Sequence, residues 1–210
     1  MEVRDKIIEK AGDLMLHYGV RTVTMDDISR DLGISKKTIY QYFKDKKDLI
    51  NTITEMHLDM ERDRFSACLS ENHDSIYSLI LLSQCMRESM RDMKLNLLNE
   101  LQKFYPEAWN MFQKFKSETM LCSITSVIIK GQKEGYFRKA LDPELMAKMR
   151  IEQVQAVFIN PTLFPRDKYT LTEVQMQLFD HFVHGLFTLE GHQLFNQYTT
   201  EKLKQNETLN

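Results

Sequence analysis

The 210-residue sequence has few of the residues that interrupt helices, with only 7 glycines and 4 prolines. Its three cysteines, Cys68, Cys85 and Cys122, are widely spaced and odd in number, so we expect buried thiols rather than a disulfide framework or a CxxC metal site. No apolar run reaches the roughly 18 residues of a membrane-spanning helix, and the charged start MEVRDKIIEKAG is unlike a signal peptide. These absences predict a cytoplasmic protein with no membrane partner.

The residues that are present favour helices. Hydrophobic residues make up 42% of the chain and charged residues 28%, as is usual for a soluble globular protein. Leucine, methionine, lysine, glutamate and glutamine are abundant, and all of them have high helix propensity. We therefore expect an all-α fold, long enough for one large domain or for a small domain joined to a larger one.

The net charge of −2 hides one basic segment. Residues 36–47 contain five lysines and only one acid, Asp45. A local excess of cations on an otherwise acidic chain is typical of a surface that binds a polyanion. This segment therefore predicts nucleic-acid binding.

Two short helices joined by a glycine turn are predicted around this segment. Thr24 can cap the first, with Asp27 three residues later in a capping-box arrangement. Gly33 ends that helix, and Ser35 can cap a second one that begins at Lys36. A helix, a short turn with glycine and another helix form the helix-turn-helix pattern.

The second of these helices separates an apolar face from a polar one. Ile39 and Phe43, four residues apart, face the core. The other faces carry lysines, hydroxyls and an amide but no acid, whereas an exposed helix face usually mixes both signs. Lysine and tyrosine donate to phosphate oxygens, and glutamine can pair with adenine. We interpret this segment as a DNA recognition helix, followed by a helix that Asp45 caps and that places Lys46 at its N-terminus.

The span from about Ile7 to Ile50, with TMDDISRDLGISKKTIYQYFKDKKDLI at its centre, resembles the TetR family of bacterial one-component regulators. The residues that match the family pattern are Thr24, Gly33, Ser35, Thr38, Tyr40, Tyr42, Phe43, Lys46 and Leu49. The resemblance implies phosphate contacts from Thr24, Ser35, Tyr40, Tyr42 and Lys46. It also implies that Lys36, Lys37, Thr38 and Gln41 lie at base edges or nearby phosphates. A helix-turn-helix used only for packing is the alternative.

The same resemblance implies the domain organisation. We expect a three-helix helix-turn-helix domain at residues 1–48, and a helical effector-binding and dimerisation domain at residues 49–210. In that second domain, TLTE at 170–173 is a capping box for the final major helix, which we expect to reach about Leu189. The polar tail EKLKQNETLN is expected to fray.

The final major helix is apolar over more than one stripe, whereas a helix that packs only on its own domain needs one. The extra stripe predicts a surface for a second subunit, and the resemblance implies a four-helix bundle between two copies, suited to a palindromic operator on double-stranded DNA. Deep burial within one chain is the alternative. The predicted interface residues of this homodimer are Val174, Leu178, Phe179, Phe182, Val183 and Leu186.

An effector site is marked only weakly. The resemblance implies a small molecule among the central helices, and the candidate contacts are Met86, Met90, Phe104, Trp109, Phe112 and Gln153. Methionine and aromatic residues at helical spacing are equally typical of an ordinary core. We expect an unidentified, largely apolar small-molecule effector.

Signals for an enzyme are missing. The chain has no GxSxG, P-loop, GxGxxG or HExxH motif, and His181 and His184, beside Asp180, lack a third metal-ligand motif. We therefore predict no catalytic residues, metal or cofactor. The predicted function is that of a sequence-specific transcriptional regulator, a repressor released from its operator by a ligand. The alternative is a DNA-associated protein that recruits a protein partner without a small-molecule inducer.

Overall fold

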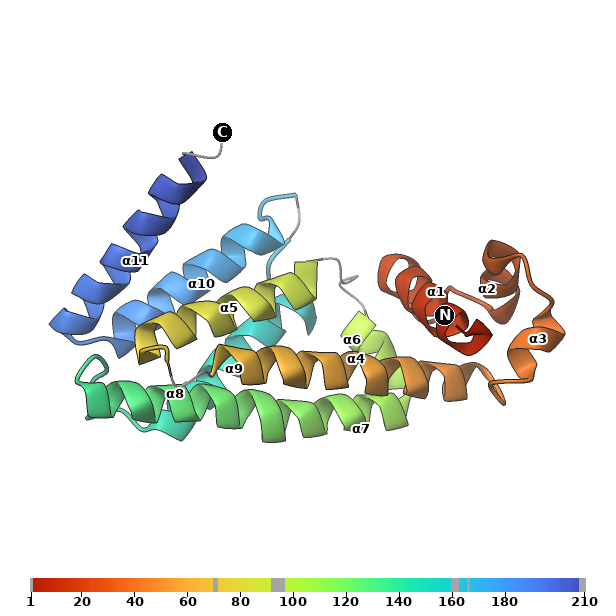
Figure 1. The fold of residues 1–210 in the computed structure, drawn as a ribbon, viewed down its shortest axis with the longest axis horizontal. Helices are drawn as coiled ribbons and strands as arrows, with labels where there is room; N and C mark the ends of the chain where they lie inside the picture. The colour runs from red at the N-terminus through yellow and green to blue at the C-terminus, as the bar shows by residue number, and fades with distance from the viewer. Residues whose placement is uncertain (1, 70–71, 92–96, 160–162, 166, 208–210) are drawn as a thin grey trace.

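The computed structural model describes residues 2–69, 72–91, 97–159, 163–165 and 167–207. Within these ranges the regular structure is helical, apart from one isolated bridge between Phe137 and Phe187, and the expected all-α fold is confirmed (Figure 1). The helices are α1 (Val3–Tyr18), α2 (Met25–Leu32), α3 (Lys36–Tyr40), α4 (Lys46–Cys68), α5 (Ser75–Arg91), α6 (Leu97–Phe104), α7 (Pro106–Phe115), α8 (Leu121–Glu134), α9 (Pro143–Ile159), α10 (Leu171–Leu186) and α11 (Leu189–Glu207). A π-helical turn at Lys116–Met120 joins α7 to α8.

Helices α1, α2 and α3 form the N-terminal unit at one end of an elongated molecule (Figure 1). The expected capping box is present, since the Thr24 hydroxyl accepts from the Asp27 N–H at 3.2 Å and the Asp27 carboxylate accepts from the Thr24 N–H at 2.9 Å. Gly33 ends α2 in the left-handed region, at φ 64°, where glycine is unstrained. Ile39 and Phe43 are buried as predicted.

Helix α4 connects two hydrophobic cores. Its first turns contribute Leu49 and Ile50 to the N-terminal core, which also includes Leu101 of α6 and Ala108 of α7. Farther along, Phe65 belongs to the larger C-terminal core. The predicted domain boundary between residues 48 and 49 falls inside this helix, so a displacement of α4 acts on both cores at once.

The C-terminal core is built from α4, α5 and the later helices. Helices α7 and α8 follow one nearly continuous path through the π-helical turn; α7 runs along α4, and α8 packs against α5 and α9 (Figure 1). Fully buried side chains such as Phe65, Leu82, Ile124 and Phe158 fill the space between them. None of the helices in the described ranges combines the length and the hydropathy of a membrane span.

The end of the chain differs from the prediction. The capping box of Thr170 and Glu173 is present, but α10 ends at Leu186 rather than near Leu189. Phe187 then adopts an extended conformation, and the Thr188 hydroxyl accepts from the Gly191 N–H at 3.2 Å at the start of α11. The tail that was expected to fray is helical through Glu207. Leu194, Phe195 and Tyr198 of α11 pack against the C-terminal core.

The residues predicted to form the dimer interface belong largely to the core of a single subunit. Val174, Phe182, Val183 and Leu186 are buried, and Leu178 and Phe179 are partly buried against the same core. The physical reason is that α10 packs against both α9 and α5, so its two apolar stripes have partners within the chain. The burial of these four residues within one subunit fits the alternative interpretation, and their place in a dimer interface stays a prediction. Among the described side chains of α9 and α10, the large apolar ones that are exposed are Leu145, Met149 and Met176.

Candidate nucleic-acid interface

Helix α3 presents the predicted polar side chains at the surface. The Ser35 hydroxyl accepts from the Thr38 N–H at 3.1 Å, and the two hydroxyls share a hydrogen bond of 2.8 Å. These contacts fix the first turn of α3. Lys37 and Tyr40 are exposed on the helix, and Tyr42 is exposed just beyond it. Tyr40 and Tyr42 therefore leave part of each ring open to a ligand.

Gln41 lies one residue beyond the end of α3. Its backbone remains helical, at φ −72° and ψ −25°, and its N–H donates to the carbonyl oxygens of Lys37 at 3.2 Å and Thr38 at 3.3 Å. Its side chain is exposed. The outward face of the helix therefore continues as far as Gln41, although the helix proper is only five residues long.

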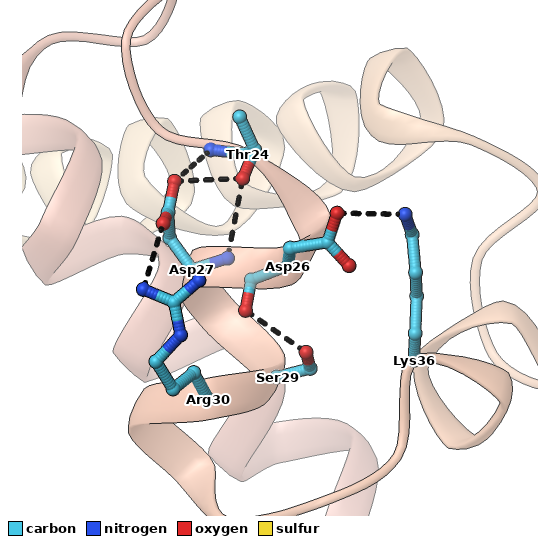
Figure 2. A network of polar contacts seen from close by, with 6 residues as sticks. All are labelled: Thr24, Asp26, Asp27, Ser29, Arg30 and Lys36. Carbon is cyan, nitrogen blue, oxygen red and sulfur yellow. Dashed lines mark hydrogen bonds and ion pairs between the residues drawn. The ribbon is translucent and has the colours of Figure 1, made fainter.

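Lys36 connects the two helices of the helix-turn-helix (Figure 2). Its Nζ lies 2.9 Å from Oδ2 of Asp26, in the first turn of α2, and the hydrogen bond to Asp26 raises the pKa of Lys36. On the same turn, Asp27 lies 3.7 Å from Arg30, and its pKa is lowered chiefly by the hydrogen bonds from Thr24. Lys36 is thus engaged within the protein.

Lys46 is half-buried at the junction with α6. Its Nζ donates to the carbonyl oxygen of Arg21 at 3.2 Å, and the Arg21 N–H donates to the Glu100 carboxylate at 2.8 Å. Burial lowers the pKa of Lys46, while the charges of Glu100 and Asp27 oppose this effect. Lys46 therefore holds the turn between α1 and α2, and Glu100 links that turn to α6.

The acids beside this surface accept hydrogen bonds from their own segments. Asp45 accepts from the Asp48 N–H at 2.9 Å, and Asp48 accepts from the Lys44 N–H at 2.9 Å. Three nearby lysines are exposed and form no ion pair with any described residue; they are Lys37, Lys44 and Lys47. The surface around α3 is therefore cationic, as a DNA-binding face requires.

The N-terminal unit matches a known family. Residues 7–53 match the profile described as "Bacterial regulatory proteins, tetR family". The uncharacterized HTH-type transcriptional regulator YvaF of Bacillus subtilis (strain 168) is 25% identical over 167 residues, which cover 78% of this chain and 85% of that protein. The N-terminal unit is therefore a TetR-family DNA-binding unit. An HTH-type transcriptional regulator of Staphylococcus aureus (strain USA300) is 26% identical over 155 residues, covering 63% of this chain and 83% of that one.

The whole chain has the TetR-family architecture. A putative transcriptional regulator from Saccharomonospora viridis, solved in complex with choline, superposes with a TM-score of 0.76 and 22% identity, over 88% of this chain and 97% of that one. The regulatory protein TetR from Rhodobacter sphaeroides gives a TM-score of 0.71 and 15% identity, over 87% and 97%. At these identities the likeness establishes the fold.

The structure brings together two of the predicted effector contacts. Met86 and Phe112 line a cavity of about 500 Å³. Trp109 is half-buried against Phe112, with ring centroids 5.6 Å apart, but it is not among the described lining residues. The cavity lies between α1 and α4, at the junction with the DNA-binding unit.

The other predicted contacts lie elsewhere. Phe104 is partly exposed and packs on the Arg21 guanidinium, which lies 5.0 Å from the ring centroid, because α6 abuts the turn between α1 and α2. Gln153 of α9 has a buried Oε1 with no hydrogen-bond partner among the described residues. The side chain of Met90 lies outside the described residues. Phe104 and Gln153 are therefore not part of this cavity.

A metal centre is not evident in the part of the chain that the structure describes. No three histidine, cysteine, aspartate or glutamate side chains gather there closely enough to hold an ion. His184 lies 3.4 Å from Asp180 and stacks on His192 at 4.8 Å between ring centroids. These histidines instead link α10 to α11.

Proposed function

We propose that this TetR-family regulator binds a palindromic operator as a homodimer and represses transcription until a small, largely apolar ligand releases it. The observation that carries the proposal is the position of the cavity of about 500 Å³ between α1 and α4. Helix α1 belongs to the DNA-binding unit, and α4 belongs to both cores. A ligand there would contact both units. If it binds the conformation that does not fit the operator more tightly than the one that does, it shifts the protein away from DNA.

The exposed groups around α3 support sequence-specific contacts. Lys37 and Gln41 have no side-chain partner among the described residues and are free to reach phosphates or base edges. Tyr40 and Tyr42 can donate to flanking phosphates. Five of the predicted DNA contacts have hydrogen-bond partners within the protein: Thr24, Ser35, Lys36, Thr38 and Lys46. We propose that they position the recognition helix and contact DNA only with those hydrogen-bond donors that the internal bonds leave free.

Two features favour the ligand-released repressor over a recruiter of protein partners. The cavity has the size of a small-molecule site, whereas a recruiter needs no such cavity. In addition, the related fold from Saccharomonospora viridis was solved with a small molecule, choline. Exposed Leu145, Met149 and Met176 on α9 and α10 provide apolar surface for the second subunit.

Selection from a pool of random duplexes tests the proposal. The protein should enrich a sequence with dyad symmetry whose half-sites lie about one helical turn apart, roughly 34–36 Å. Sedimentation should show a dimer both free and on the selected duplex. Enrichment of sites without symmetry, or a monomer on DNA at micromolar concentration, would contradict the operator model. Occupied promoters whose transcription falls when the gene is deleted would contradict repression.

A further inference from the structure

The geometry points to a lipophilic cation as the ligand of the cavity between α1 and α4, with its positive charge facing Glu61. This inference rests on the proposed function, because it specifies the ligand that the regulator answers to. Four observations support it: the apolar floor, the sign of the charges on the walls, the burial of Glu61 and the position beside α1.

The floor of the cavity is apolar and aromatic. Helix α4 contributes Leu58 and Phe65, α7 contributes Phe112 and Phe115, and α5 contributes Met86. The rings of Phe65 and Phe115 meet edge to face, with centroids 5.7 Å apart. Aromatic rings and methionine bury an apolar ligand, and the faces of the rings attract a cation.

Every charged side chain of fixed sign on the described walls is acidic. Asp5, Glu9 and Asp13 lie along α1 at the rim, and Glu61 lies on α4. His57 is the only potentially basic group, and no lysine or arginine occurs among the described lining residues. The exposed or partly exposed rim acids are screened by solvent, whereas the buried Glu61 is screened less, so the four acids together favour a cation over an anion of the same shape.

Glu61 is the buried charged group among the described lining residues. It is only 5% exposed, and its oxygens accept from the Ser89 hydroxyl and, at 3.3 Å, from the guanidinium of Arg64. Arg64 extends toward solvent, with 54% of its side chain exposed, so it neutralises the carboxylate only from outside. A buried carboxylate is costly unless its charge is balanced. A cation within the cavity would balance it from the inside.

The position of the site explains how binding would reach the DNA. Gly12 and Leu16 of α1 line the cavity together with Ile53 and His57 of α4, and α1 packs directly on α4 where Gly12 meets Ile53. A ligand between these helices contacts the DNA-binding unit directly rather than through the distal core. Its size would therefore set the separation between α1 and α4, and with it the orientation of α2 and α3.

Calorimetry on the full chain without DNA tests the charge preference. The probes are tetraphenylphosphonium and tetraphenylborate, a cation and an anion of nearly the same shape. The cation should bind at least about tenfold more tightly than the anion, a difference that a single buried charge can supply. Glu61→Gln, which keeps the size of the side chain, should weaken cation binding about tenfold. Glu144→Gln, an exposed acid on α9, is the matched control and should bind like the wild type.

A second variant keeps the inference testable if Glu61→Gln fails to fold. The double substitution Glu9→Gln and Asp13→Asn changes only exposed acids at the rim. It should weaken cation binding by a smaller factor than Glu61→Gln does and leave the circular dichroism spectrum unchanged. Equal cation affinity in the wild type and both variants would overturn the inference, as would tighter binding of tetraphenylborate.

The DNA assay separates this inference from the proposed function. Tetraphenylphosphonium should release the wild type, but not Glu61→Gln, from the selected duplex at the same concentration. Glu61-dependent binding without release would support the cation site and contradict ligand-induced release. The opposite result is also possible: an uncharged or anionic ligand releases the protein from DNA, and no cation binding depends on Glu61. That result would support the proposed function and overturn the cation site.

Discussion

Lys36 Nζ lies 2.9 Å from Asp26 Oδ2, so an ion pair joins the first turn of α3 to the first turn of α2. Both side chains are about half exposed, at 46% and 59%, so the pair is screened by solvent and acts on orientation more than on stability. The consequence is that the basic segment offers fewer free cations than its five lysines suggest. We therefore expect Asp26 to limit non-specific attraction to DNA.

Asp26→Asn should increase affinity for random duplexes, because it removes an acid from the DNA-facing surface and frees Lys36. The slope of log K against log salt should steepen by about 0.9 for each phosphate that the released lysine contacts. Fluorescence anisotropy over a range of salt concentrations measures this slope. Asp31→Asn, which breaks a 2.7 Å ion pair with Lys10, is the control and should change the slope less. An unchanged slope in Asp26→Asn would show that Lys36 does not reach phosphate.

Gln41 and Lys37 should have separable effects. Gln41→Ala should cost about 1–3 kcal/mol per half-site on the selected operator and leave binding to scrambled duplex unchanged, because an amide reads base edges. Lys37→Ala should weaken both duplexes alike and reduce the salt slope, as loss of a phosphate contact does. Salt titrations on the two duplexes measure both effects. Equal losses on both duplexes for Gln41→Ala would assign glutamine a positioning contact instead.

Helix ends in this protein could be predicted because their causes lie within a few residues. The Thr24 and Thr170 capping boxes, the Asp45 cap and the Gly33 turn each depend on hydrogen bonds between neighbours three or four residues apart. The same locality allowed α3 to be predicted from its residues alone, while its role as a recognition helix stays a prediction. The end of α10 was placed too late because the Phe187 break is stabilised by distant contacts, including Thr188 N–H to the Tyr136 carbonyl at 2.9 Å.

Tertiary contacts decided what could not be predicted. The two apolar stripes of α10 indicated a second subunit, and the sequence could not show that α5 and α9 of the same chain also pack on this helix and bury four of the six predicted interface residues. Met86 and Phe112 of the cavity were predicted, but the contribution of α1 was not, because α1 and α4 are separated by two helices in sequence. Glu61 did give a signal, as an acid on the apolar stripe between Leu58 and Phe65. A carboxylate in that position indicates either a buried partner or a site.

Arg150→Met should stabilise the protein by about 1 kcal/mol. The Arg150 side chain is only 3% exposed, and its guanidinium forms no ion pair with any described residue. Burial and the nearby charge of Arg87 lower its pKa to about 10. The folded state therefore holds this proton less tightly than the unfolded chain does. The positive charge destabilises the folded state below about pH 10, and this destabilisation becomes smaller as the pH rises above that value. Methionine removes this cost and gives up the contacts with Phe179 and Phe182.

Urea denaturation at neutral pH measures that change, with exposed Lys148→Met on the same helix as the control. The control should change the free energy of unfolding by less than about 0.5 kcal/mol. A loss of stability in Arg150→Met greater than about 1 kcal/mol would show that the guanidinium has an anionic partner in the assembled protein. That partner would be a bound ligand or a residue of the second subunit.

Met176→Glu and Phe182→Ala should distinguish the surface of α10 from its core. Met176 is 58% exposed, so a charge there should leave the subunit folded and weaken the homodimer at least about tenfold, because it would be buried unpaired between subunits. Phe182 is only 7% exposed, so its truncation should instead cost about 3–5 kcal/mol of unfolding free energy. Sedimentation equilibrium measures the first effect and urea denaturation the second. If Met176→Glu leaves the dimer affinity unchanged, the interface lies away from this face of α10. If Phe182→Ala is folded but monomeric, the interface includes the buried stripe after all.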